Sequence, residues 1–333
     1  MNKIRVLWKT IWILLTDGEL AASFFRNVLS LLRFRLKFLF TKKKFIVIAL
    51  TEHLGDVVAA EPVARHMKSK FPACFLAWVV DSKYKELINS NPIIDKTVSV
   101  SCFTEWILLK HFLSKKSIYD LHINNKVCER HHFINIKSNP YDIDFDNYFE
   151  KGNLLHAFSR SAGIEIPDNI APCLYLKSGN IAHTIPANYI VMHTDSNHPD
   201  KMWDNECWIE LSKFILEKFR KYSIVEIGFE KRIKIQDPRN IDLTGKRSLS
   251  SISRLISDSQ LFIGVDSGFA HFANALEKNS LIFIGRFRHF KNYLPYSGKF
   301  QREKDNTIFY YHGSLKDMPC HDVFDLVSKK LNS

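Results

Sequence analysis

A short polar loop follows the apolar run at residues 45–50, and its residue types could support proton transfer. The loop, residues 51–56, has the sequence TEHLGD and precedes a helical pattern at 57–70. Asp56 ends the loop, and a carboxylate at a helix N-terminus could accept a proton from an attacking hydroxyl. Asp is also a preferred N-cap residue, so simple capping of the helix is the alternative. The loop lacks the GxGxxG spacing of dinucleotide sites, which disfavours a nicotinamide-dependent dehydrogenase.

A second polar segment, residues 193–203, follows another apolar run. Thr194 and Lys201 suit a diphosphate, because Lys supplies a point charge and Thr a hydrogen-bond donor. The alternative is a polar surface loop with Trp203 packed in the core. The same segment contains Asp and His residues, but no recognised metal-ligand spacing, so we expect no metal site here.

The third segment is the most specific. A buried run at 261–265 leads into Asp266, Ser267 and Gly268. The small residues allow close backbone approach, and the helix that follows presents free N–H groups to an anion. His271 would point back along this helix toward the same ligand. The G-x-S-x-G pattern of a nucleophile elbow is absent, so a hydrolase with Ser267 as nucleophile is not expected.

Alternating strand and helix patterns surround these segments. Apolar runs typical of buried parallel strands recur along both halves of the chain, separated by helical patterns. The runs are 45–50, 75–80, 97–100 and 118–123 in the first half, and 189–193, 223–227, 261–265 and 281–284 in the second. This alternation predicts an α/β protein with two doubly wound, Rossmann-like domains that face a central cleft.

Proline-punctuated residues between the two series predict an interdomain linker. We therefore expect four parts: an N-terminal arm (1–44), an N-terminal domain (45–180), a C-terminal domain (187–318) and a C-terminal helix (319–333).

The N-terminal arm carries most of the positive charge. Ten Lys and Arg against two acidic residues give the arm 10 − 2 = +8 of the total net charge of +12. Residues 20–40 show an amphipathic pattern with basic residues at steps of three and four, continued by Lys42, Lys43 and Lys44. Such a helix could lie on an anionic membrane surface or pack against the body of the protein, and the sequence leaves both open. Because the charge is confined to the arm, we expect no nucleic-acid partner.

Six cysteines are scattered without a CxxC pair, so the spacing predicts neither a zinc site nor a disulfide framework. A reducing cytosol is the simpler interpretation. The apolar run at 11–15 is shorter than a signal peptide or a membrane-spanning helix requires.

Taken in order, the motifs resemble those of the family 9 glycosyltransferases, the ADP-heptose:lipopolysaccharide heptosyltransferases. The family pattern combines Gly-Asp followed by Pro, Lys-x-Trp, Leu-Thr-Gly-x-x-Ser/Thr-Leu, and Asp-Ser-Gly-x-x-His. The matching residues are Gly55, Asp56 and Pro62; Lys201 and Trp203; Leu243, Thr244, Gly245, Ser248 and Leu249; and Asp266, Ser267, Gly268 and His271. In the third motif, residues 242–246 read DLTGK, which could line the site or form a simple turn. The resemblance covers about residues 45–285.

The resemblance implies an inverting GT-B glycosyltransferase that needs no metal ion or other cofactor. Its N-terminal half would bind a lipid-linked glycan acceptor of the lipopolysaccharide core at the cytoplasmic face of the bacterial inner membrane. Asp56 would be the general base, with His53 and Gly55 on the acceptor side.

The C-terminal half would bind the nucleotide-diphosphate sugar, usually ADP-heptose. Thr194 and Lys201 would contact the diphosphate, and Glu230 is a candidate for the donor ribose. The phosphates and the transferred sugar would be held by Asp266, Ser267, Gly268 and His271.

Three departures from the family pattern affect specificity. Glu52 and His53 stand where small hydroxyl residues are common, Asp204 replaces the usual Pro, and residues 286–290 read RFRHF in place of small and hydroxyl residues. Two alternatives therefore stay open: a GT-B transferase with another nucleotide sugar, and a catalytically weak, membrane-associated subunit of glycan assembly.

Overall fold

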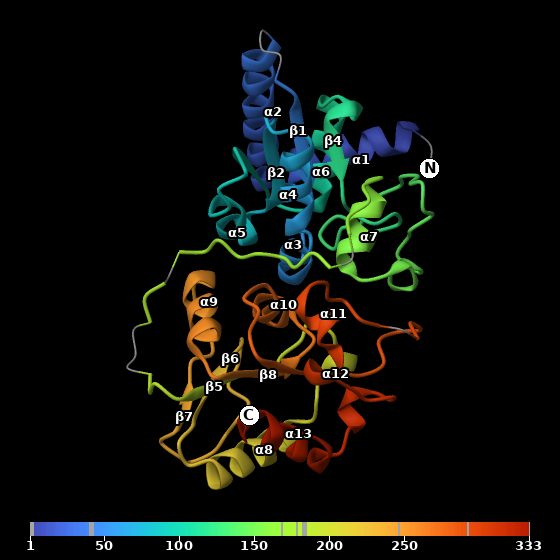
Figure 1. Cartoon of the computed structure of the whole chain (residues 1–333). Coiled ribbons are helices and arrows are strands. Elements are labelled where there is room, and N and C mark those ends of the chain that lie inside the picture. The colour runs from blue at the N-terminus through green and yellow to red at the C-terminus, as the bar shows by residue number, and fades with distance from the viewer. Residues whose placement is uncertain are drawn as a thin grey trace. The chain divides into compact units, whose positions relative to one another are not determined.

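The computed structural model describes residues 3–39, 43–167, 169–177, 179–181, 185–245, 247–291 and 293–332. Lys42 and Lys246, which belong to the patterns above, lie outside these residues. The chain forms two compact units (Figure 1). Unit 1 comprises Met1–Lys151 and Leu155–Ile166, and unit 2 comprises Gly152–Leu154 and Pro167–Ser333. The domain boundaries at 180 and 187 stay predictions.

Unit 1 contains a parallel sheet in the order β3-β2-β1-β4. Its strands are β1 (Phe45–Ala49), β2 (Phe75–Asp81), β3 (Lys96–Val100) and β4 (Ile118–Asp120). Its helices are α1 (Lys3–Thr16), α2 (Gly18–Leu39), α3 (Leu54–Ala59), α4 (Glu61–Lys70), α5 (Lys85–Asn89), α6 (Phe103–Leu109) and α7 (Leu154–Ser161). The strand order reverses between β1 and β4, and ligands of doubly wound sheets bind at such a switch point.

Unit 2 contains a six-stranded parallel sheet in the order β10-β9-β8-β5-β6-β7. Its strands are β5 (Tyr189–His193), β6 (Ser223–Ile227), β7 (Asn240–Asp242), β8 (Leu261–Val265), β9 (Ser280–Ile284) and β10 (Ile308–Tyr310). Its helices are α8 (Asn205–Lys218), α9 (Leu249–Asp258), α10 (Gly268–Ala275), α11 (Lys299–Arg302), α12 (Lys304–Thr307) and α13 (Phe324–Asn332). The switch point lies between β5 and β8, so the second and third polar segments both follow strands that meet there.

The predicted fold class, two doubly wound parallel-sheet domains, is confirmed. The central strands β1, β5 and β8 are almost wholly buried, which explains their continuous apolar sequences. The helix expected at 57–70 differs in detail. It begins three residues earlier, at Leu54, and breaks at Ala60, because Pro62 lies in the first turn of a new helix, α4.

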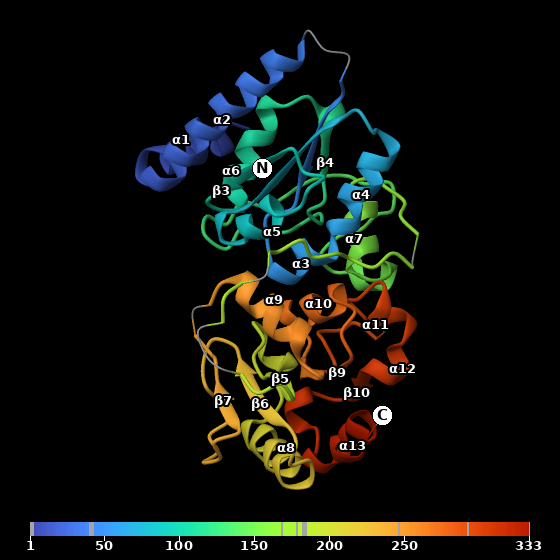
Figure 2. The same cartoon turned by 60° about the vertical axis from the view of Figure 1, so that its left-hand side comes forward.

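The N-terminal arm forms two helices, whereas the sequence analysis predicted one. Figure 2 shows α1 and α2 on one flank of unit 1, beside α6. One face of the pair joins the apolar core of unit 1 through Ile13, Leu20, Phe24 and Leu31. Among the described residues, no helix is both long and apolar enough to cross a bilayer.

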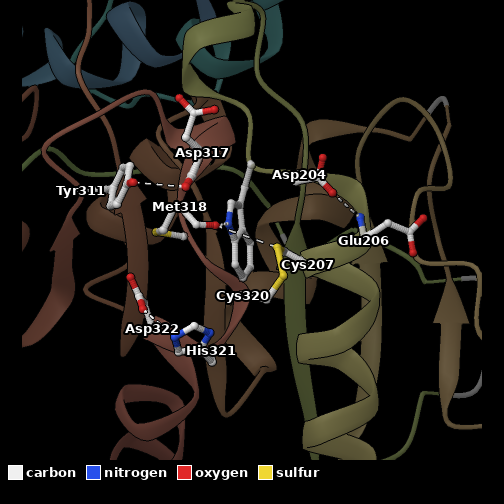
Figure 3. Close-up of a disulfide and its surroundings, with 10 residues drawn as sticks. Asp204, Glu206, Cys207, Tyr311, Asp317, Met318, Cys320, His321 and Asp322 are labelled. Carbon is white, nitrogen blue, oxygen red and sulfur yellow. Dashed lines mark hydrogen bonds and ion pairs between the residues drawn. A yellow bond between two sulfur atoms is a disulfide. The ribbon is translucent and has the colours of Figure 1, made fainter.

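The cysteine prediction was wrong in one respect. Cys207 at the start of α8 forms a disulfide with Cys320, 113 residues later, in a short 3₁₀ turn that precedes α13 (Figure 3). The neighbouring Trp203 indole donates a hydrogen bond to the Met318 carbonyl at 2.9 Å, which joins the same two segments. Sequence spacing did not indicate the pair, because it arises from the packing of two elements far apart in the chain.

Candidate active site

The candidate base, Asp56, is the third residue of α3 and is half-buried. Its Oδ2 atom accepts a hydrogen bond from the backbone N–H of His53 at 3.0 Å, and His53 is the N-cap residue. The carboxylate therefore supports the helix start from within the first turn rather than from the cap position. An ionised carboxylate has about four acceptor positions, so this bond leaves it able to accept a proton. Gly55 is buried beside it.

A buried network anchors the strand end just before this loop. The His122 ring accepts a hydrogen bond from the Thr51 backbone N–H at its Nε2 atom (3.0 Å) and lies 2.7 Å from Asp120 through Nδ1. Because Nε2 is the acceptor, Nδ1 carries the proton and donates it to Asp120. Thr51 lies two residues after the end of β1, and Asp120 ends β4, so the network spans the switch point of unit 1.

The charges of this network are set by burial and by nearby lysines. Burial lowers the pKa of His122 to about 4, which keeps the ring neutral. Burial alone would raise the pKa of Asp120, but the His122 ring and the Lys137 and Lys110 ammonium groups hold it below its usual value. Sequence reasoning missed this network, because both residues sit in a short run interpreted only as a strand.

Glu52 and His53 of the loop 51–56 form a cluster with Glu129. Their ligand atoms lie within 4.8 Å of one another, a spacing that could hold a metal ion. Glu52 Oε2 is also 3.7 Å from the Lys126 ammonium group, and a lysine at this distance disfavours a second cation. Burial raises the pKa of Glu52. Glu52 is thus a second candidate proton acceptor in the loop 51–56.

In unit 2, a buried carboxylate connects the second and third polar segments. The Asp266 Oδ2 atom lies 2.6 Å from the Lys201 ammonium group, and Tyr296 donates to Oδ1 at 2.6 Å. Tyr293 donates to Oδ2 and lies 2.5 Å from Lys201 Nζ. Burial would raise the pKa of Asp266, but Lys201 and the neighbouring His271 hold it below its usual value. A charged Lys–Asp pair therefore follows β5 and β8.

The helix after β8 begins at this pair. Ser267 is the N-cap of α10, and its hydroxyl accepts a hydrogen bond from the Ala270 N–H at 3.3 Å. The buried His271 ring packs against Tyr296, with ring centroids 4.7 Å apart. Ser196 adds a further link by donating to the Asp266 carbonyl at 3.2 Å. The N–H groups at the start of α10 and the Lys201 ammonium group are hydrogen-bond donors of the kind that phosphate oxygens accept from, and Asp266 neutralises the charge of Lys201 in this corner.

A model of glycosyltransferase family 9, the heptosyltransferases, matches residues 166–289, which include this corner. Lipopolysaccharide heptosyltransferase 1 of Campylobacter coli is 24% identical over 297 residues, which are 75% of this chain and 86% of the relative. The protein is a family 9-like glycosyltransferase.

Solved structures share the fold of this transferase. The family 9 glycosyl transferase of Veillonella parvula matches with a TM-score of 0.60 at 18% identity, over 87% of the transferase and 98% of that chain. ADP-heptose lipopolysaccharide heptosyltransferase II of E. coli matches with a TM-score of 0.60 at 16% identity, over 87% and 98% of the two chains. The GT-B fold predicted from the motifs is confirmed by these likenesses.

Two predicted donor residues of the transferase lie apart from the Lys–Asp pair. Thr194 is buried, and its hydroxyl donates to Glu226 at 3.4 Å. Glu230 is exposed in the loop after β6. The same loop approaches Asp195, whose carboxylate accepts from the Phe229 N–H at 3.0 Å and lies 2.5 Å from Arg232. Arg232 is thus a cation near the strand ends that sequence reasoning missed.

The loop geometry depends on a glycine. Gly228 has φ of +150°, and a Cβ atom at this position would lie 2.6 Å from a carboxylate oxygen of Asp195. The positive φ would strain any other residue, and a Cβ atom would also displace the Asp195 carboxylate, so this turn favours glycine.

Aromatic residues surround the transferase lysine. The Lys201 ammonium group lies 4.1 Å from the ring centroid of Phe287 and 4.9 Å from that of Tyr293. These distances are typical of cation–π contacts, which hold the ammonium group in place. Phe287 belongs to the RFRHF segment, residues 286–290, that departs from the family pattern. One residue of this unusual segment therefore contacts Lys201.

Proposed function

We propose that the transferase moves a sugar, heptose, from a nucleotide-diphosphate donor, ADP-heptose, to a glycan acceptor of the lipopolysaccharide core, with inversion and without a metal ion. The main support for donor binding in unit 2 is the Lys201–Asp266 pair beside the N-terminus of α10. The proposal is also supported by the E. coli heptosyltransferase that was solved with ADP, which matches with a TM-score of 0.59 over 86% of this chain.

The donor would bind in unit 2 with its charges matched. Lys201 and the N–H groups at the start of α10 would face the diphosphate, and Thr194 and Glu230 would complete the nucleotide side. Asp266 is an acceptor of hydrogen bonds, so its role would be to hold Lys201 and to accept from sugar hydroxyls rather than to meet phosphate.

Transfer would proceed as a single displacement. Asp56 removes the proton of an acceptor hydroxyl, the oxygen attacks the anomeric carbon, and the bond from that carbon to the diphosphate oxygen breaks. The electron pair leaves with the nucleoside diphosphate, where Lys201 and the helix N–H groups stabilise the added negative charge. One in-line displacement inverts the anomeric configuration.

Nucleotide binding tests the donor assignment. Purified protein is titrated calorimetrically with ADP, UDP, GDP and CDP, with and without EDTA, alongside Lys201→Ala as a control for the phosphate corner. Metal-independent preference for ADP that weakens in the variant supports the proposal. Preference for another nucleotide would retain a GT-B transferase and discard ADP-heptose. Binding of none of the four would favour the non-catalytic assembly subunit, to which the Glu52–His53 cluster points.

We also propose that the transferase is a peripheral protein on the cytoplasmic side of the inner membrane and that residues 1–44 contact the membrane surface. The charge of +8 on this segment and the lipid-linked nature of the proposed acceptor support this placement.

A further inference from the structure

The α1–α2 pair has two apolar faces, and the body of the protein accounts for one of them. The inner face of α2 packs Leu20, Phe24 and Leu31 into the core of unit 1. Polar contacts fix it there, since Asn27 donates to the Ser99 carbonyl at 2.7 Å and to Glu105 at 2.8 Å. The pair is therefore a fixed part of unit 1 rather than a detached arm.

The second apolar face points to solvent. Its residues are large and are each between 40% and 79% exposed: Trp8, Ile11, Trp12 and Leu15 on α1, and Phe25, Leu29, Leu32 and Leu36 on α2. We call these eight residues the outer face. Helices that cover a globular core normally expose polar residues on the side away from it. An exposed apolar set of this size marks an interaction site.

The spacing shows that each helix presents one continuous stripe. Steps of three and four residues align the four members on α1, and the same holds for those on α2. At 3.6 residues per turn, the α2 stripe spans roughly 60°, and its centre lies about 130° around the helix from that of Leu20, Phe24 and Leu31. Arg26 and Arg33 lie about 70° to 90° from the centre of the stripe, and both are exposed. A basic border thus runs along one side of the apolar stripe.

The positive charge of residues 1–44 indicates which kind of partner binds the outer face. The two acidic residues of the segment, Asp17 and Glu19, both pair with Arg130 of the unit 1 body, at 2.7 and 3.2 Å. The ten cations of residues 1–44 therefore keep a large excess positive charge. A second copy of the same face would bring two such charges together and be repelled, whereas anionic lipid headgroups would attract it. Tryptophans with basic neighbours are also typical of helices at a bilayer interface.

We propose that the outer face of α1 and α2 inserts into the interface of an anionic lipid bilayer, with the two helices lying in the membrane plane and Arg26 and Arg33 at the headgroups. The inference rests on the proposed function in one respect, because a lipid-linked acceptor would bring the enzyme to such a surface. Lipid binding can nevertheless be measured apart from transfer.

The test uses the full chain and vesicles of phosphatidylcholine, alone or mixed with phosphatidylglycerol. Trp8 and Trp12 supply a direct readout, because the other four tryptophans are at most 3% exposed. We expect mixed vesicles to protect tryptophan fluorescence from an aqueous quencher, and we expect the protein to sediment together with these vesicles. Both effects should be weaker at high salt. Vesicles of phosphatidylcholine alone should bind less.

Matched variants assign the binding to the outer face. Trp12→Ser with Leu29→Ser should weaken partitioning into mixed vesicles about tenfold or more. The control, Val127→Ser with Ile136→Ser, removes two other exposed apolar residues of unit 1 and should bind as the wild type does. Arg26→Gln with Arg33→Gln should reduce the preference for phosphatidylglycerol. Thermal unfolding of each variant confirms that α1 and α2 remain packed.

Several outcomes would overturn the inference. The first is that the wild type does not bind mixed vesicles. The second is that the outer-face and control variants lose vesicle binding equally. The third is that the protein binds no vesicles but forms a concentration-dependent dimer that the outer-face variant abolishes. Failure of the proposed function looks different. In that case nucleotide binding and transfer to a delipidated acceptor fail while vesicle binding persists.

Discussion

The ammonium group of Lys201 lies 2.6 Å from a carboxylate oxygen of Asp266, and the Asp266 side chain is 5% exposed. The partners lie in the segments that follow two adjacent strands of the sheet, β5 and β8, although 65 residues separate them in the chain. The pair therefore links the two segments that would form the proposed donor site.

Removing one partner of this pair should lower the free energy of unfolding more than removing both. Lys201→Met leaves a buried carboxylate without its cation, and we expect a loss of about 3 kcal/mol in the free energy of unfolding. Lys201→Met combined with Asp266→Asn should recover a substantial part of that loss. A double-mutant cycle by urea denaturation measures the coupling. Simple additivity of the two losses would show that the pair is not a stabilising unit.

Asp56→Asn should reduce transfer about 10²- to 10⁴-fold while leaving ADP affinity unchanged, because the amide cannot accept the proton. Stability should change little, since the amide oxygen can still accept from the His53 N–H. Glu52→Gln is the paired variant, because Glu52 is the other carboxyl group in the loop 51–56. Steady-state kinetics on both variants identify the base. A large loss in Glu52→Gln with a small one in Asp56→Asn would reassign it.

Acid should destabilise the protein by protonating His122 and Asp120, which form the buried network next to the loop 51–56. The folded pKa of His122, about 4, lies below the ordinary value of 6.5, so its contribution to stability is complete above pH 6.5 and is lost as the pH falls toward 4. The full loss for this buried ring is about 3 kcal/mol. Asp120, whose folded pKa is also lowered, adds further loss below its unfolded value of about 3.8.

Urea denaturation at several pH values between 7 and 4 checks this, with His122→Gln as the comparison. The variant should be less stable at pH 7 but should lose less stability on acidification. If both proteins show the same slope in this window, titration of His122 does not control acid stability.

Reduction of the disulfide should destabilise unit 2. The Cys207–Cys320 bond closes a loop of 113 residues, for which the chain-entropy model gives a contribution of about 4 to 5 kcal/mol. Alkylation of the denatured, unreduced protein followed by mass spectrometry should label four of the six cysteines. Dithiothreitol should lower the unfolding midpoint of the wild type but not that of Cys207→Ser with Cys320→Ser. Six labelled cysteines without reductant would contradict the bond.

The amino-acid sequence by itself determined the central strands and the polar segments that follow them. Strands such as β1 and β8 are buried on both faces, so nearly every residue must be apolar, and the change to polar residues at each strand end is visible in the sequence. Parallel topology then carries those ends to one edge of each sheet. For this reason Asp56, Lys201 and Asp266 could be named before the structure was known.

Tertiary structure decided the contacts between residues far apart in the chain. Tyr293 and Tyr296 reach Asp266 only because the segment after β9 returns past β8, and Cys207 meets Cys320 only through the packing of α8 against the C-terminal segment. Hydrophobic periodicity reports which face of an element is apolar, but it does not report what covers that face. The pattern of α2 therefore allowed both packing and lipid contact, and three-dimensional packing assigned one stripe to the core and left the other exposed.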